Sequence, residues 1–311
     1  MAGYKDEIFG KIEPGARLHL IYATFVPLVG LVLMAVVPGL VLIPAFLADW
    51  VPTDDQQISN PGLLYVLAVS FGALSLAVFA WVKWVEKRPL ASMGWRFERA
   101  FARYGRGFAI GLGMNIISIA LIGLAGGYEV GAWLPAMASP MALVWIFLFL
   151  IGFVIQGGTE EVLTRGWLMS TFASRWGWPA AVGVTSVMFA LMHIGNEPGH
   201  INWIAMTNIV LIGIFFGLYA VREKSLMGVC AAHASWNWMM GIGFGLNVSA
   251  MKIDVAPLLV ELEQMPLVDK AITGGSFGPE GSLIVSAVLA VSCWLVWRWK
   301  GEEVPDKGQS N

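Results

Sequence analysis

Residues 141–165 read MALVWIFLFLIGFVIQGGTEEVLTR. The first fifteen positions of this stretch are apolar or glycine, and charged side chains appear only at Glu160, Glu161 and Arg165. A helix needs about 20 apolar residues to cross a bilayer, and an ionisable side chain inside such a helix is costly and by default marks function. The stretch therefore predicts a membrane-spanning helix, over about 141–170, that carries chemistry beyond its apolar part.

The composition of the whole chain agrees with a lipid environment. Of the 311 residues, 57% are hydrophobic and 13% are charged, and the mean hydropathy is +0.70. A soluble domain carries roughly 25% charged residues, so this chain could not cover itself with polar surface in water, and we expect the lipid bilayer as its partner. The net charge is −2, and no basic block indicates nucleic-acid binding.

Apolar stretches recur along the entire chain and predict an all-α fold. We expect a polytopic membrane helix bundle of about eight transmembrane helices, forming one membrane-embedded domain over 1–311 with a catalytic core at about 141–247. The expected spans lie near 18–47, 61–82, 105–126, 141–170, 179–194, 202–221, 226–247 and 281–298.

Charge predicts the orientation of the bundle, since Lys and Arg beside helix ends favour the cytoplasm. The alternate connections at 1–17, 83–106, 161–178, 222–225 and 298–311 hold 17 of the 19 Lys and Arg residues. We therefore expect both termini in the cytoplasm, and the absence of a targeting extension is compatible with a bacterial inner membrane. The exceptions are Lys252 and Lys270, in an outer connection at 248–280. This connection could fold over a cavity or form a flexible loop, and we favour the flexible loop.

Polar side chains within the expected spans fall into three pairs, each spaced i,i+4 and therefore on one face of a helix. The pairs are Glu161/Arg165, Phe189/His193 and His233/Asn237, with Glu160 beside the first of them.

The turn at 176–179 should join two of these helices as an antiparallel hairpin. Glu160 and His193 lie about equally far from that turn, roughly 25 Å at 1.5 Å per residue, so they can meet. His233 would lie shallower than this pair unless the hairpin projects beyond the membrane. If it does project, three helices can bring a carboxylate, two imidazoles and a carboxamide together.

This set of groups suits the hydrolysis of an amide by water. A glutamate in an apolar setting can act as a general base, and a histidine can help to hold or deprotonate the water. A His/Asn pair can donate hydrogen bonds to the oxyanion. Cys230 and Ser235 belong to no recognisable hydrolase motif, and two cysteines in apolar runs suggest neither a disulfide framework nor a Cys-based zinc site. Direct attack by water therefore fits best.

At these residues the chain resembles the family of CAAX proteases and bacteriocin-processing enzymes. That family has the motifs Glu-Glu-x-x-x-Arg, Phe-x-x-x-His and His-x-x-x-Asn or Asp, and this chain matches all three in order on separate hydrophobic segments. The resemblance implies that Glu160 and His193 activate the water and that His233 and Asn237 form the oxyanion site. Glu161, Arg165 and Phe189 would then be supporting residues.

The resemblance implies an intramembrane endopeptidase that cleaves a peptide or a membrane-anchored protein, lipidated or not, without a cofactor or metal. Two other functions stay open at this point. A zinc-dependent membrane protease would use two His and a Glu as ligands, although the His-Glu-x-x-His motif is absent. A non-catalytic binding or bacteriocin-immunity protein would keep the same fold. A proton-relaying transporter is disfavoured, because no matching half-sequence repeats with interrupted helices appear.

Overall fold

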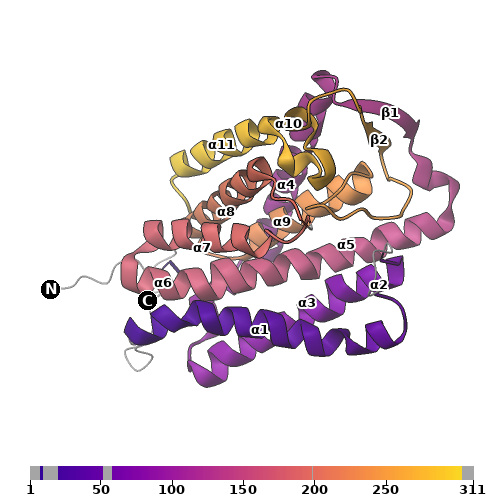
Figure 1. The fold of residues 1–311 in the computed structure, drawn as a ribbon. Coiled ribbons are helices and arrows are strands. Elements are labelled where there is room, and N and C mark those ends of the chain that lie inside the picture. The colour runs from indigo at the N-terminus through magenta and orange to yellow at the C-terminus, as the bar shows by residue number, and fades with distance from the viewer. Residues whose placement is uncertain (1–7, 10–19, 52–57, 198, 303–311) are drawn as a thin grey trace.

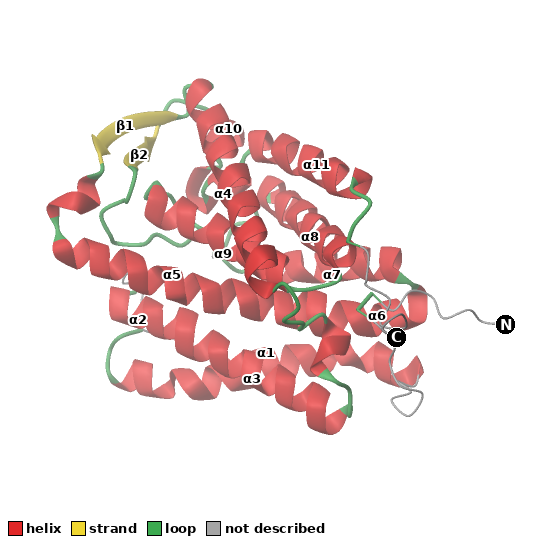
Figure 2. Ribbon diagram, turned by 180° about the vertical axis from the view of Figure 1, so that it is seen from behind, coloured by secondary structure: helices red, strands yellow, loops and turns green. Residues whose placement is uncertain are grey.

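The structure is a computed structural model that describes residues 8–9, 20–51, 58–197 and 199–302. In these residues the fold is mostly helical, with two short strands (Figure 2). The α-helices are α1 (Leu20–Leu47), α2 (Asn60–Tyr65), α3 (Phe71–Ala80), α4 (Ala100–Leu124), α5 (Pro140–Glu161), α6 (Met169–Trp176), α7 (Trp178–Met192), α8 (Trp203–Glu223), α9 (Met227–Trp238), α10 (Lys270–Thr273) and α11 (Leu283–Arg298). The strands are β1 (Tyr128–Trp133) and β2 (Val260–Gln264).

Short helices of other types complete the backbone. Turns of 3-10 helix lie at Leu90–Met93, Pro135–Ala138, Gly275–Phe277 and Pro279–Gly281. Segments of π-helix lie at Val66–Ser70, Trp81–Val85, Val162–Leu168 and Met239–Gly243. The π-helix is rare in proteins overall, and where it occurs it is often at a functional site. One π segment joins α2 to α3, and another continues α5 into α6.

Each of the eight expected stretches coincides with a helix or a continuous helical run. Within the described residues, five runs are long and apolar enough to cross a membrane, namely Phe25–Leu47, Asn60–Val85, Ala100–Leu124, Pro140–Trp176 and Trp203–Glu223. Helices α7 and α11 are apolar but shorter. The protein is therefore an integral membrane protein, while the count of eight spans stays a prediction. The terminal residues 1–7, 10–19 and 303–311, on which the predicted orientation partly depends, lie outside the described residues.

The long helical run Pro140–Trp176 explains how the site residues reach one depth. At 1.5 Å per residue its 37 residues extend about 55 Å, whereas the hydrocarbon core of a bilayer is about 30 Å thick. One end of this run must therefore project beyond that core. Projection of the end at Trp176 is what the depths predicted from the sequence require for His233 to reach the depth of Glu160, and which end projects stays a prediction.

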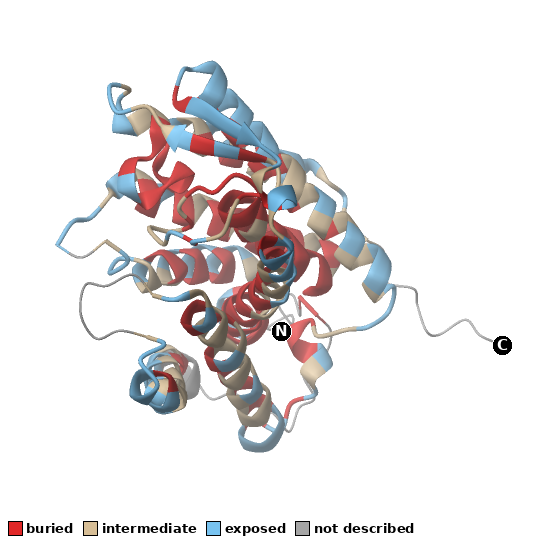
Figure 3. Ribbon diagram, turned by 90° about the vertical axis from the view of Figure 1, so that its right-hand side faces the viewer, coloured by how far each residue is buried: buried red, intermediate tan, exposed pale blue. Residues whose placement is uncertain are grey.

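Helix α9 lies at the centre of the bundle. It packs against α4, α5 and α8, and every residue from Met227 to Asn237 is buried. In Figure 1, α5 runs between the pair α1 and α3 on one side and α7, α8 and α9 on the other. Buried residues gather in the middle of the molecule and exposed ones on its outside (Figure 3). The polar motifs on α5 and α9 are therefore held in the best-packed part of the fold.

Small residues allow α4 to approach α9 closely. Gly107 and Gly111 lie one turn apart on α4, and a Cβ added at either would overlap the α9 backbone, at Gly228 and Ala232 respectively. Such paired small residues let membrane helices pack backbone against backbone. The position of α9 in the bundle therefore depends on the absence of side chains at these two glycines.

We expect Gly111→Ala to lower the stability of the protein by about 1–3 kcal/mol, because overpacking a tight contact forces backbone shifts. Gly113→Ala is the matched control on the same helix, since a Cβ there would meet nothing within 4 Å and alanine is the better helix former. Unfolding of the purified protein in detergent measures both. A Gly111→Ala protein as stable as the Gly113→Ala protein would contradict this packing.

The outer connection at 248–280 is ordered, so its interpretation as a flexible loop is wrong. Strand β2 within it pairs antiparallel with β1, with Tyr128 opposite Gln264 and Trp133 opposite Val260. The buried Glu280 accepts hydrogen bonds from the backbone N–H and the hydroxyl of Ser249, at 2.7 and 2.8 Å. Backbone pairing and a buried carboxylate thus fix a segment whose last residues, 273–280, read TGGSFGPE.

On the opposite side, the segment after α11 is tied to α4 and α8. The Glu302 carboxylate accepts hydrogen bonds from Arg103 and Arg106, each at 2.7 Å, and the Glu302 N–H donates to Arg222 O at 2.8 Å. Partial burial tends to raise the pKa of Glu302, but the hydrogen bonds from the two arginines outweigh it and lower that pKa below its ordinary value.

Because the Glu302 pKa is lower in the folded than in the unfolded protein, its stabilising contribution is present above the unfolded value of about 4.3. That contribution is lost as the pH falls through the lower folded value. We therefore expect Glu302→Gln to be less stable than the wild type at neutral pH, with the gap closing as the pH falls below about 4. Thermal unfolding in detergent across this range measures the gap, and a gap independent of pH would contradict the ion pairing.

Candidate active site

The two adjacent glutamates at the end of α5 face different surroundings. Successive residues of a helix point about 100° apart, so Glu160 lines a cavity while Glu161 is fully buried. Glu160 Oε2 is buried and has no hydrogen-bond partner among the described residues. An unpartnered carboxylate oxygen beside a cavity is free to accept a proton from a bound molecule.

Glu161 and Arg165 form a buried ion pair, as their i,i+4 spacing predicts. Arg165 Nη1 lies 2.9 Å from Glu161 Oε1, and neither side chain is exposed. The guanidinium lies over the ring of Phe189, 4.4 Å from its centroid, and 5.5 Å from that of Phe216. Aromatic faces attract a cation in this geometry. Phe189 therefore supports the charged pair from α7.

His233 on α9 is held between the two glutamates. Its Nδ1 lies 2.8 Å from Glu161 Oε1, its Nε2 lies 3.6 Å from Glu160 Oε2, and its ring stacks on Phe216. An ionised carboxylate only accepts hydrogen bonds, so the proton of this pair is on Nδ1. His233 can then donate from Nε2 only as an imidazolium, and in its neutral form Nε2 is an acceptor. Because Glu161 fixes one proton on Nδ1, protonation of Nε2 decides whether His233 donates or accepts a hydrogen bond there.

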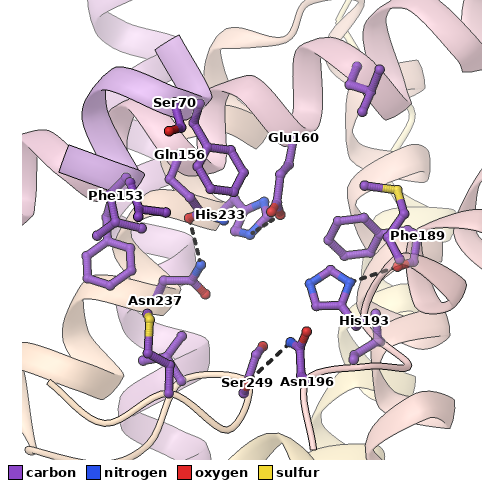
Figure 4. A pocket seen from close by; sticks show the side chains of 18 of the residues that line it. Ser70, Phe153, Gln156, Glu160, Phe189, His193, Asn196, His233, Asn237 and Ser249 are labelled. Carbon is purple, nitrogen blue, oxygen red and sulfur yellow. Dashed lines mark hydrogen bonds and ion pairs between the residues drawn. The ribbon is translucent and has the colours of Figure 1, made fainter. Parts of the chain in front are cut away.

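His193 follows the last residue of α7 and is oriented by its own helix. Its Nδ1 lies 2.8 Å from Phe189 O, and a carbonyl oxygen only accepts, so Nδ1 carries the proton. The Phe189 ring meets the imidazole edge-on, with centroids 4.6 Å apart. In neutral His193 the other nitrogen, Nε2, is therefore a proton acceptor, and His193 lines the same cavity as Glu160 (Figure 4).

Asn237 lies one turn beyond His233 on α9 and also lines the cavity. Its Nδ2 donates to Gln156 Oε1 at 3.1 Å (Figure 4). This bond fixes the orientation of the Asn237 amide and uses one of its two N–H donors. The second N–H is left for a bound molecule.

The cavity has a volume of about 660 Å³. Its wall is mainly apolar and comes from α1, the run Asn60–Ala80, α5, α7, α8, α9 and the outer connection. Glu160, His193, His233 and Asn237, predicted on three separate helices, all line it. A mostly apolar pocket with a few convergent polar groups is the usual form of a ligand site.

Cys230 and Ser235 lie away from the cavity wall. Ser235 is fully buried and its hydroxyl donates to Ala232 O at 3.1 Å, while the Cys230 thiol faces Gly158 O. Burial raises the free energy of an ionised thiol or alkoxide, so neither group is placed as a nucleophile. In the described part of the chain, no three or more His, Cys, Asp or Glu side chains are grouped as ligands for a metal ion.

Four polar residues of the cavity wall were not predicted from the sequence, namely Ser70, Gln156, Ser249 and Glu280. Gln156 precedes Glu160 by four residues, and this i,i+4 spacing was the available signal. Glu280 left no such signal, because it lies in the outer connection. Its carboxylate accepts a hydrogen bond from Trp236 Nε1 at 3.3 Å and so fastens that connection to α9.

Residues 140–239 match a known protein family, described as type II CAAX prenyl endopeptidase Rce1-like. The matched range contains all three motifs and runs from the start of α5 to the end of α9. Comparisons with curated proteins and with solved structures give no match. The motifs, their arrangement around one cavity and the match over residues 140–239 agree: the part of the chain from α5 to α9 is similar to the CAAX-protease family, and these findings support that family for the protein.

Proposed function

We propose that this protein is an intramembrane endopeptidase that hydrolyses a peptide bond of a membrane-anchored or lipidated peptide or protein. One observation carries the proposal: Glu160, His193, His233 and Asn237, from α5, α7 and α9, line a single cavity within the helix bundle. Helices α5 to α9 would form the catalytic core, at about 141–247. We further propose that the protein lies in a bacterial inner membrane with both termini in the cytoplasm.

The proposed reaction begins with a water molecule held between Glu160 and His193 Nε2. Glu160 accepts a proton from this water while the oxygen of the water attacks the scissile carbonyl carbon. Glu160 later gives the proton to the leaving nitrogen. The negative charge that develops on the carbonyl oxygen is stabilised by donors from Asn237 Nδ2 and from His233 Nε2 as an imidazolium. The hydrogen bond from His233 Nδ1 to Glu161 keeps the imidazole oriented, and the Glu161 carboxylate balances its charge.

Arg165 and Phe189 act on this reaction from a distance. Arg165 neutralises Glu161 and holds it where it meets His233. Phe189 contributes its ring to Arg165 and its carbonyl oxygen to His193. One aromatic residue thus connects the first two motifs, which supports its assignment as a supporting residue.

The proposal is tested with protein reconstituted in liposomes and a panel of membrane-anchored, internally quenched peptides, both prenylated and unprenylated. We expect cleavage of at least one peptide, with mass spectrometry identifying the two fragments, and the same rate when a chelator is present. Loss of cleavage in chelator, restored by zinc, would instead support the zinc-protease alternative. Failure to cleave any peptide would contradict the endopeptidase assignment and favour a binding protein of the same fold.

A further inference from the structure

Gln156 is a buried polar residue that the proposed reaction leaves unused. It is 7% exposed, lines the cavity and lies one turn before Glu160 on the same face of α5. Its Oε1 accepts the hydrogen bond from Asn237, and within the described residues its Nε2 donates no hydrogen bond to a protein group. Amide N–H donors on a cavity wall can bind an acceptor of a molecule in the cavity.

A second unused group lies on the same wall. Ser70 is 2% exposed and lines the cavity, and its hydroxyl has no hydrogen-bond partner within the described residues. It ends the π-helical segment Val66–Ser70, a type of helix that re-aims side chains and is frequent at functional sites. Ser70, Gln156 and Asn237, here called the polar strip, appear along one side of the cavity in Figure 4.

The spacing along α5 matches the repeat of an extended peptide. Gln156 and Glu160 are four residues apart, so their backbone positions differ by about 6 Å along the helix axis. In an extended chain, carbonyl groups that point the same way recur every second residue, or about 6.6–6.8 Å. A peptide lying along α5 with its scissile bond at Glu160 would therefore present another carbonyl to Gln156.

We propose that the polar strip is a binding site for the substrate backbone, in which Gln156 Nε2 donates to the carbonyl oxygen two residues from the scissile bond. This inference rests on the proposed function, because it takes the substrate to be a peptide cut at Glu160. Gln156 has a double role: its oxygen orients Asn237 and its nitrogen binds substrate. The site selects an extended segment through its backbone and makes no demand on side-chain identity.

The test combines a variant of the protein with a change in the peptide. Gln156→Leu keeps a similar volume but removes both the acceptor for Asn237 and the free donors, whereas Gln156→Glu keeps an acceptor and removes the donors. We expect each to lower kcat/KM for the cleaved peptide about 5- to 100-fold, because a buried hydrogen bond is lost. Ser70→Ala should give a smaller loss, about 2- to 10-fold.

Alkene isosteres that replace one peptide amide at a time locate the contact. For the wild type, one such replacement, two residues from the scissile bond, should lower kcat/KM about as much as Gln156→Glu does, because both remove only the contact with the donors of Gln156. The same replacement should have little further effect on the Gln156→Leu protein, since the contact is already absent. A residue that only maintained the fold would give additive losses at every position.

Thr159→Val is the matched control. Thr159 is buried on the same helix and its hydroxyl donates to Phe71 O at 3.0 Å, but it does not line the cavity. We expect its kcat/KM to equal that of the wild type. If wild type and Gln156→Leu cleave equally while Glu160→Gln is inactive, the backbone site is wrong and the proposed function stands. If the wild type cleaves no peptide, the proposed function fails and the backbone site fails with it.

Discussion

Glu160→Gln will reduce peptide hydrolysis by about 10²- to 10⁴-fold, the usual contribution of a general base. The amide has nearly the same shape as the carboxylate but cannot accept a proton from water. Glu160 Oε2 has no hydrogen-bond partner among the described residues, and His233 Nε2 lies 3.6 Å from it. The substitution therefore removes no hydrogen bond of that oxygen, so the variant should remain folded and the loss should appear in kcat.

The comparison variant for this prediction is Glu197→Gln. Glu197 accepts a hydrogen bond from the Ser276 hydroxyl at the surface and does not line the cavity. Glu197→Gln should leave kcat unchanged. The test compares the cleavage rates of the two variants at equal amounts of folded protein. If Glu160→Gln were as active as Glu197→Gln, the role of Glu160 as a base would be wrong.

Arg165→Met will destabilise the protein by about 3–5 kcal/mol. Both members of the Arg165–Glu161 pair are completely buried, and removing one partner leaves an uncompensated charge in a medium that solvates it poorly. The substitution also removes the contacts of the guanidinium with the rings of Phe189 and Phe216. Denaturant or thermal unfolding in detergent measures the change in the free energy of unfolding.

The double variant Glu161→Gln/Arg165→Met separates charge from packing. It removes both charges, so it should recover a large part of the stability that Arg165→Met loses, while remaining catalytically impaired because His233 loses its ionised partner. Arg175→Met, at an exposed position of α6, should change stability by less than about 0.5 kcal/mol. An Arg165→Met protein as stable as Arg175→Met would contradict the buried ion pair.

The sequence predicts the positions of the helices better than it predicts their relation to the membrane. Apolar runs such as 141–170 are long and uninterrupted, so hydropathy alone places them near α5 and its continuation. Hydropathy does not show that this helical run continues through a π segment to Trp176. The flexible-loop interpretation of the outer connection was wrong because pairing between β1 and β2 joins residues about 130 positions apart, which no local pattern reveals.

The site is predictable where its residues share a helix face. The i,i+4 spacings alone place Glu161 with Arg165 and His233 with Asn237. The contacts of His233 with Glu161 and of Asn237 with Gln156 do not follow from spacing, because they depend on the register between α5 and α9. That register is set by close packing at glycines such as Gly157, which faces His233 across the interface.

Direct attack by water on the scissile bond can be tested by a single-turnover cleavage in water enriched in heavy oxygen, with hydroxylamine present. If water attacks directly, the new carboxyl group of the product carries one heavy oxygen and no hydroxamate forms. A hydroxamate product, or a covalent adduct between peptide and protein, would show that a side chain of the protein attacks first, and would contradict the role assigned here to Glu160.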